Sequence, residues 1–206
     1  MVESQDTWPL PDYNPGQPKH LHAVGVIAVV FAQLERSVES LYHAEAWRKK
    51  MPDELTNLYF YTLNEEKRIE AIRQIYSGYI KKHPEIVALI GNLLDYFNWC
   101  RDCRNHILHS ENYPAAFGGK SETLYLTKRI GKQNPRPGYI QFTLPRLRSI
   151  ADKIRTAVVQ SATIEIRLRY LGVPHSEIRQ PYLDIVREPL PQTLCVPRNL
   201  RLTPRP

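Results

Sequence analysis

The chain has 206 residues, a length that suits one domain with flanking segments better than two full domains. Its hydrophobic fraction of 42% is sufficient to bury a core. The 28 lysines and arginines exceed the 21 acidic residues, giving a formal net charge of +7. This charge favours a polyanionic partner such as RNA, DNA or an anionic lipid, although it would serve solubility equally well.

Cysteine usage and the absence of targeting patterns point to a reducing compartment. Three cysteines, Cys100, Cys103 and Cys195, are too few and odd in number to form a disulfide framework. The first 20 residues lack the basic segment and apolar run of a signal peptide. The most apolar stretch, residues 24–32, is too short to cross a bilayer as a helix. We therefore expect a cytoplasmic protein without a membrane partner.

The N-terminal half is predicted to contain an extended arm followed by three helical regions. Residues 1–19 are rich in proline, which blocks regular helix, so we expect an arm there. Residues 20–50 carry one apolar stripe at helical spacing: Val24, Ile27, Phe31, Leu34, Val38 and Leu41. A second helical region follows Met51, with Asn64 as a plausible N-cap and an end near Lys82. A third helix has Pro84 at its first position and ends near Ser110.

The C-terminal half is predicted to contain a β-hairpin, a long helix and a second arm. Residues 121–143 alternate in polarity around a turn-rich centre, which is typical of a hairpin. Apolar residues then repeat every three or four positions from Leu147 to Leu171, and Gly172 marks the end of that helix. Residues 173–206 are rich in proline and arginine and are expected to form an extended arm.

These elements predict an all-α protein. Helices joined by short or moderate connections favour an antiparallel bundle of four to five helices over residues 20–172, with the hairpin inserted and arms at both ends.

The most informative segment is RDCRNHILH, residues 101–109, at the end of the third long helix. Arg104, Asn105 and His109 match a motif of Arg, a polar residue, three variable residues and His. This motif and the order of helices resemble the HEPN superfamily of ribonuclease-like helical domains over about residues 20–172. The resemblance implies metal-independent RNA cleavage that leaves a 2′,3′-cyclic phosphate. It also implies a homodimer whose two motifs face one cleft, often in a defence or toxin–antitoxin setting where an antitoxin protein restrains the enzyme.

The chemistry of these side chains agrees with that implication. His109 is the candidate general acid or base, because imidazole titrates near neutral pH. Arg104 is the candidate phosphate ligand, because its planar donors match phosphate oxygens. Asn105 could orient the histidine or the phosphate. Residues five apart are separated by about 140° on a straight helix. Arg104 and His109 therefore meet only if the arginine bends or the helix end distorts. Arg101 shares a face with Asn105 and His109 and is a supporting candidate.

Further basic and histidine side chains could assist at such a site. His106 could supply a second acid or base within one protomer. The hairpin region carries four basic residues that could contact an RNA backbone or remain solvated: Lys128, Arg129, Lys132 and Arg136.

Three alternative interpretations stay open. Asp102, His106 and His109 share a helical stripe and could bind a metal, but no second motif offers a fourth ligand, so no metal or cofactor is expected. The Cys100-x-x-Cys103 pair resembles a redox or zinc motif, yet its position late in a helix favours buried thiols. The bundle could also be a catalytically inactive RNA-binding or protein-interaction module, with Arg104 paired to Glu35 or Glu39.

Overall fold

The computed structural model describes residues 18–79, 81–109, 111–112, 123–130, 136–197 and 203–204. Most of them lie in helices, which confirms the all-α expectation at the level of fold class. The α-helices are α1 (Pro18–Arg48), α2 (Asp53–Thr62), α3 (Glu65–Ser77), α4 (Pro84–Leu108), α5 (Leu144–Arg169) and α6 (Tyr182–Arg187). The expected N-terminal arm falls largely outside the described residues, and α1 already begins at Pro18.

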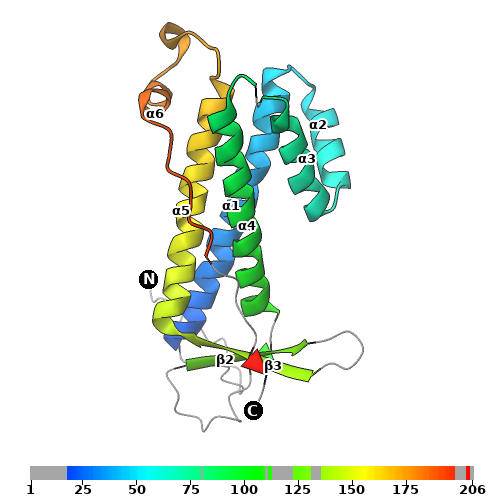
Figure 1. Ribbon diagram of the computed structural model, residues 1–206, viewed down its shortest axis with the longest axis vertical. Helices are drawn as coiled ribbons and strands as arrows, with labels where there is room; N and C mark the ends of the chain where they lie inside the picture. The colour runs from blue at the N-terminus through cyan, green and yellow to red at the C-terminus, as the bar shows by residue number, and fades with distance from the viewer. Residues whose placement is uncertain are drawn as a thin grey trace, which may run out of the picture.

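Three long helices, α1, α4 and α5, lie side by side and form the body of the molecule (Figure 1). The most extensive contact joins α1 to α5, and these two helices run in the same direction while α4 runs the opposite way. The α1–α5 pair is therefore parallel. The chain returns to the starting end of α1 through α2, α3 and α4 before α5 begins. Helices α2 and α3 pack beside the C-terminal half of α1 and the N-terminal half of α4 (Figure 1).

The apolar stripes of the long helices form one shared core. In α1 the stripe is buried from Ile27 to Leu41, whereas Val24 is only partly buried. The corresponding face of α4 is buried at each position that the spacing indicates: Ile86, Ile90, Leu93, Phe97 and Cys100. The face of α5 is buried at Leu147, Ile150, Ile154, Ala157, Ser161, Ile164 and Leu168. Burial of these stripes, which were visible in the sequence, holds the three helices together.

Local chemistry sets several helix boundaries. The Asn64 side chain accepts a hydrogen bond of 2.9 Å from the Lys67 amide, which confirms Asn64 as the N-cap of α3. Pro84 opens α4, as the sequence predicts. After α5, Gly172 has φ +83°, a left-handed conformation that glycine adopts without steric cost.

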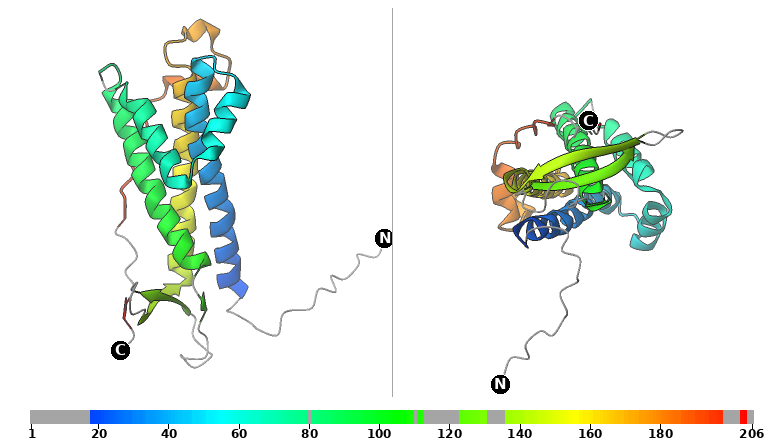
Figure 2. Two further views of the ribbon diagram at one scale, coloured as in Figure 1. Left: turned by 90° about the vertical axis from the view of Figure 1, so that its right-hand side faces the viewer. Right: turned by 90° about the horizontal axis from the view of Figure 1, so that it is seen from below.

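A small sheet lies across the ends of the long helices (Figures 1 and 2). Its first three strands lie between α4 and α5 in the chain. Strand β2 (Thr123–Ile130) pairs antiparallel with β3 (Arg136–Thr143), in a register that runs from Thr123↔Thr143 to Ile130↔Arg136. The short strands β1 (Glu111–Asn112) and β4 (Thr203–Pro204) complete the order β1-β2-β3-β4. Strand β2 contacts α4, so the sheet adjoins the helix that carries the candidate motif.

The segment after α5 returns along the long helices (Figure 1). It contains a 3-10 turn, His175–Glu177, and the helix α6, which the sequence analysis did not predict. Side chains of the long helices bind its backbone. Asn92 on α4 bonds both the amide (2.7 Å) and the carbonyl (2.9 Å) of Leu194, and Gln160 on α5 donates to the Gln192 carbonyl at 2.9 Å.

Helix α1 is more apolar than the nine-residue stretch in its N-terminal half suggests. By length and composition, Lys19–Arg48 could cross a membrane, with a mean hydropathy of 1.4 over its most apolar 18 residues. The estimate based on residues 24–32 alone was therefore too short, because Leu21, Ala23, Leu34 and Val38 extend the apolar character along the helix. One such helix is weak support for a membrane span, since core helices of soluble proteins pass the same test.

Candidate functional site

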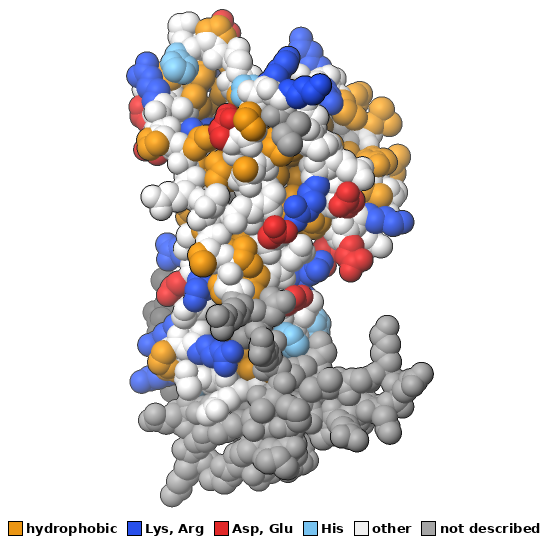
Figure 3. Space-filling view, in the orientation of Figure 1, with side chains coloured by type: hydrophobic (Ala, Val, Ile, Leu, Met, Phe, Trp, Pro, Cys, Tyr) orange, Lys and Arg blue, Asp and Glu red, His pale blue; other side chains and the backbone are white. Residues whose placement is uncertain are grey.

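The motif residues lie at the C-terminal end of α4. The helix ends at Leu108, and His109 is its C-cap, with φ −107° and ψ 12°. The His109 amide donates to the Asn105 carbonyl at 3.1 Å, so the helical bonding continues to the histidine although its backbone has left the helix. Arg104 and Asn105 are half-buried, and His109 is exposed. Histidine side chains are visible where the described surface meets the grey region near the sheet (Figure 3).

The structure brings Arg104, Asn105 and His109 into one cluster. Arg104 Nη1 donates to Asn105 Oδ1 at 2.9 Å, and the same nitrogen lies 3.4 Å from His109 Nε2. The separation of about 140° around an ideal helix is bridged by the length of the arginine side chain and by the backbone of His109, which departs from helical geometry. A guanidinium next to an imidazole nitrogen combines a permanent cation with a group that can exchange a proton near neutral pH.

An aromatic ring from α1 supports the Arg104 guanidinium. Arg104 Cζ lies 5.4 Å from the centroid of the Phe31 ring, within the range of a cation–π interaction. Phe31 is almost completely buried and stacks on Phe97 with 5.6 Å between ring centroids. Arg104 Nε is buried and has no hydrogen-bond partner among the described residues. The ring therefore fixes the guanidinium in place without using its terminal donors.

Glu35, one turn after Phe31 on α1, is a carboxylate that interacts electrostatically with this arginine. Burial raises the pKa of Glu35, Arg104 lowers it, and the neighbouring Glu65 raises it again. Arg104 belongs to none of the ion pairs that the described residues form at contact distance. Glu39 is engaged elsewhere, since it accepts a hydrogen bond from Tyr61 and lies 3.4 Å from His43. The guanidinium is thus influenced by an acid without being neutralised in a close pair.

The supporting candidates have different surroundings. Arg101 is turned towards α3, where its Nη1 lies 3.7 Å from Glu65 Oε1. This ion pair competes with any phosphate for Arg101 and gives it a role in joining α4 to α3. His106 is half-buried in the last turn of α4, beside the Arg104 cluster in sequence.

The basic residues of the hairpin are only partly described. The backbones of Lys128 and Arg129 lie in β2, and that of Arg136 begins β3. Lys132 lies outside the described residues. Because β2 contacts α4, the hairpin adjoins the helix that bears the motif, and the contribution of its charges to an RNA surface stays a prediction.

The metal and redox alternatives gain no support from geometry. Among the residues that the structure describes, no group of three His, Cys, Asp or Glu side chains could hold a metal ion, so Asp102, His106 and His109 do not converge. Cys100 and Cys103 are both buried, and burial raises the pKa of each thiol. A reactive or metal-binding cysteine needs a lowered pKa, so these thiols fit a core role.

Sequence reasoning missed two residues that shape this site. Phe31 lies on the apolar stripe and was assigned only to the core, yet one face of its ring supports Arg104. Glu35 was considered only as a direct ion-pair partner, whereas it acts on Arg104 without a close pair. The spacing of four between these residues places them on one helix face, but the helix that they face cannot be found from spacing alone.

Comparison with known proteins adds no relative. No family model matches the chain, and no curated protein or solved structure is significantly similar to it.

Proposed function

We propose that the protein is a HEPN-like, metal-independent endoribonuclease whose site contains Arg104, Asn105 and His109. The observation that carries the proposal is the 3.4 Å approach of Arg104 Nη1 to His109 Nε2 at the end of α4. The overall net charge of +7 adds attraction for RNA. In this proposal the site lies in a HEPN-like helical bundle with an inserted hairpin and two arms, and the protein is cytoplasmic.

The proposed reaction needs no group beyond the protein and the RNA. A base removes the proton of a ribose 2′-hydroxyl, and the 2′-oxygen attacks the adjacent phosphorus. The bond from phosphorus to the 5′-oxygen breaks, an acid gives that oxygen a proton, and a 2′,3′-cyclic phosphate remains. His109 exchanges one of these protons, and Arg104 stabilises the charge that develops on the phosphate. Asn105 holds the guanidinium through its 2.9 Å hydrogen bond.

The reaction needs both a base and an acid, and His109 supplies only one of them, so the proposal includes a second acid–base group. In a homodimer with facing motifs, the second His109 would supply it. Within one protomer, His106 is the nearest alternative in sequence. The exposure of His109 supports access for a second subunit or for RNA. In a toxin–antitoxin setting, an antitoxin protein would restrain this activity.

The test is cleavage of a labelled RNA by the purified protein in excess EDTA. His109→Ala and Arg104→Ala should each lower the rate by about a hundredfold or more. His175→Ala is a matched control, because His175 lies in the 3-10 turn after α5, away from the motif. This variant should cleave the RNA at the wild-type rate. Arg104→Lys tests the planar donors separately from the charge. Equal inactivity of the wild type and every variant on diverse RNAs, with the fold intact, would favour the non-catalytic binding module.

A further inference from the structure

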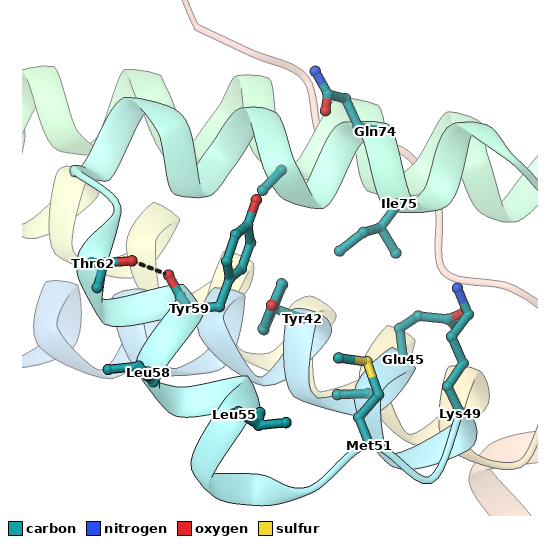
Figure 4. A pocket seen from close by; sticks show the side chains of 12 residues that line it. Tyr42, Glu45, Lys49, Met51, Leu55, Leu58, Tyr59, Thr62, Gln74 and Ile75 are labelled. Atoms are coloured by element: carbon teal, nitrogen blue, oxygen red, sulfur yellow. Dashed lines mark hydrogen bonds and ion pairs between the residues drawn. The ribbon is translucent and has the colours of Figure 1, made fainter.

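An apolar groove lies between α1, α2 and α3, away from the motif. It has a volume of about 740 Å³ and is open along one side. Its lining is Tyr42, Glu45, Ala46, Lys49, Met51, Leu55, Leu58, Tyr59, Thr62, Ala71, Gln74 and Ile75. Figure 4 shows Lys49 and Glu45 at one end of this groove and Tyr59 and Thr62 at the other. Two alanines in the lining leave the space that larger side chains would fill.

The side chains at the lip of the groove, Leu55, Leu58 and Tyr59, are apolar and yet largely exposed to solvent. Leu55 is 58% exposed, Leu58 is 65% exposed and Tyr59 is 56% exposed. On α2, only Thr56 and Phe60 are buried. Apolar side chains cluster on the surface over α2 in Figure 3. A contiguous apolar patch of this kind marks an interaction site in a soluble protein.

We propose that this groove binds an amphipathic helix of a partner protein, oriented so that an acidic residue of that helix lies beside Lys49. The proposal is independent of the ribonuclease function. Three helices already contribute apolar side chains to the groove, and a fourth helix along its open side would complete a packed layer. A small apolar ligand in the groove would leave the lip residues Leu55 and Leu58 in water, whereas a helix would cover them.

The dimensions of the groove suit a short helical segment. Residues 42–48 of α1, Lys49 just after it, and residues 55–62 of α2 run along the groove, and seven helical steps span about 10 Å. A partner helix would therefore insert apolar side chains from about two turns, at positions i, i+3 or i+4, and i+7.

Charge at one end of the groove selects an acidic group. The Glu45 carboxylate is 4% exposed and accepts hydrogen bonds from Tyr79 at 2.6 Å and from Arg48 at 3.2 Å. It is therefore compensated without Lys49, whose side chain is 62% exposed although its Nζ lies 3.3 Å from Glu45 Oε1. Two cations beside one carboxylate leave this end positive. Asp53 and Glu54, the next acids along the chain, do not line the groove.

The experiment uses the full chain and two labelled peptides of about four helical turns. Both carry leucines at i, i+3 and i+7 on one face, followed one turn later by Asp in one peptide and by Lys in the other. Fluorescence anisotropy should show saturable binding of the Asp peptide below about 1 mM and weaker binding of the Lys peptide. Leu58→Asp should weaken binding at least about tenfold. Val159→Asp is the matched control, because Val159 is 62% exposed on α5, and it should bind normally.

Reversal of the charge at the groove end tests the orientation. Lys49→Glu should exchange the preference, so that the Lys peptide binds more tightly than the Asp peptide. Circular dichroism melting checks that each variant keeps its fold. Equal binding by wild type and Leu58→Asp, or no binding of either peptide, would overturn the proposal.

Two other occupants give distinct outcomes. If wild type is dimeric in sedimentation equilibrium and Leu58→Asp is monomeric while Val159→Asp stays dimeric, a second copy of the chain fills the groove and the proposal is wrong. Saturable binding of dodecanoate without binding of either peptide would assign the groove to an acyl chain and would also overturn it.

Discussion

The contact between Phe31 and Arg104 predicts a specific energetic coupling between the core and the motif. Phe31→Leu keeps an apolar side chain but removes the ring that stacks on Phe97 and supports the guanidinium. Loss of the aromatic pair costs about 0.5–1.5 kcal/mol. Loss of the cation–π contact, with the arginine half-buried, costs about 0.5–1 kcal/mol more. Phe97→Leu removes only the first contribution, so it is the matched control.

Urea unfolding of single and double variants measures this coupling. We expect Phe31→Leu to lower the free energy of unfolding more than Phe97→Leu, because it also loses the contact with Arg104. In a double-mutant cycle with Arg104→Gln, the Phe31 substitution should show a coupling of about 0.5–1 kcal/mol. The Phe97 substitution should show a coupling near zero. Equal couplings in the two cycles, or none in either, would refute the role of Phe31 as the support of the arginine.

Three further predictions concern single residues. Asn64→Ala should lower the free energy of unfolding by about 1 kcal/mol through loss of the α3 cap, while Asn64→Ser should restore most of it; equal urea midpoints for both variants would contradict this. Gly172→Ala should cost about 1 kcal/mol, because alanine is strained at φ +83°, and an unchanged melting temperature would argue against that backbone conformation. Folding raises the pKa of Glu35, so the contribution of this residue to stability is present in acid and is lost as pH rises through its folded-state pKa. Glu35→Gln should therefore be the more stable protein at neutral pH but not in acid. A difference in the free energy of unfolding between the two proteins that does not change with pH would disprove this.

The helices that carry the site could be predicted from local patterns. Apolar residues at spacings of three and four identify the buried face of a helix without knowledge of its neighbours. This prediction was correct for the stripes of α1, α4 and α5. Asn64 and Pro84 act on their own helices, so their roles as boundary residues were also readable. The helix α6 was missed because its six residues lie between prolines, in a segment too short for periodicity to be visible.

The candidate site needed three-dimensional information. The motif residues are close in sequence, yet their contact depends on the reach of the Arg104 side chain and on the backbone of His109 beyond the helix. The roles of Phe31 and Glu35 depend on which helix faces α4. The groove between α1, α2 and α3 was equally hidden, because Leu55 and Leu58 resemble core residues when they are read as a pattern.

The chemical nature of the RNA ends tests the central claim most directly. Wild-type protein is incubated with a defined RNA in excess EDTA, and the products are analysed by mass spectrometry beside those of His109→Ala. The account predicts 2′,3′-cyclic phosphate on the upstream fragment and a 5′-hydroxyl on the downstream fragment, with both lost in the variant. Fragments with 5′-phosphate ends, or cleavage that requires a divalent metal, would contradict the assignment of Arg104, Asn105 and His109 as a metal-independent ribonuclease site.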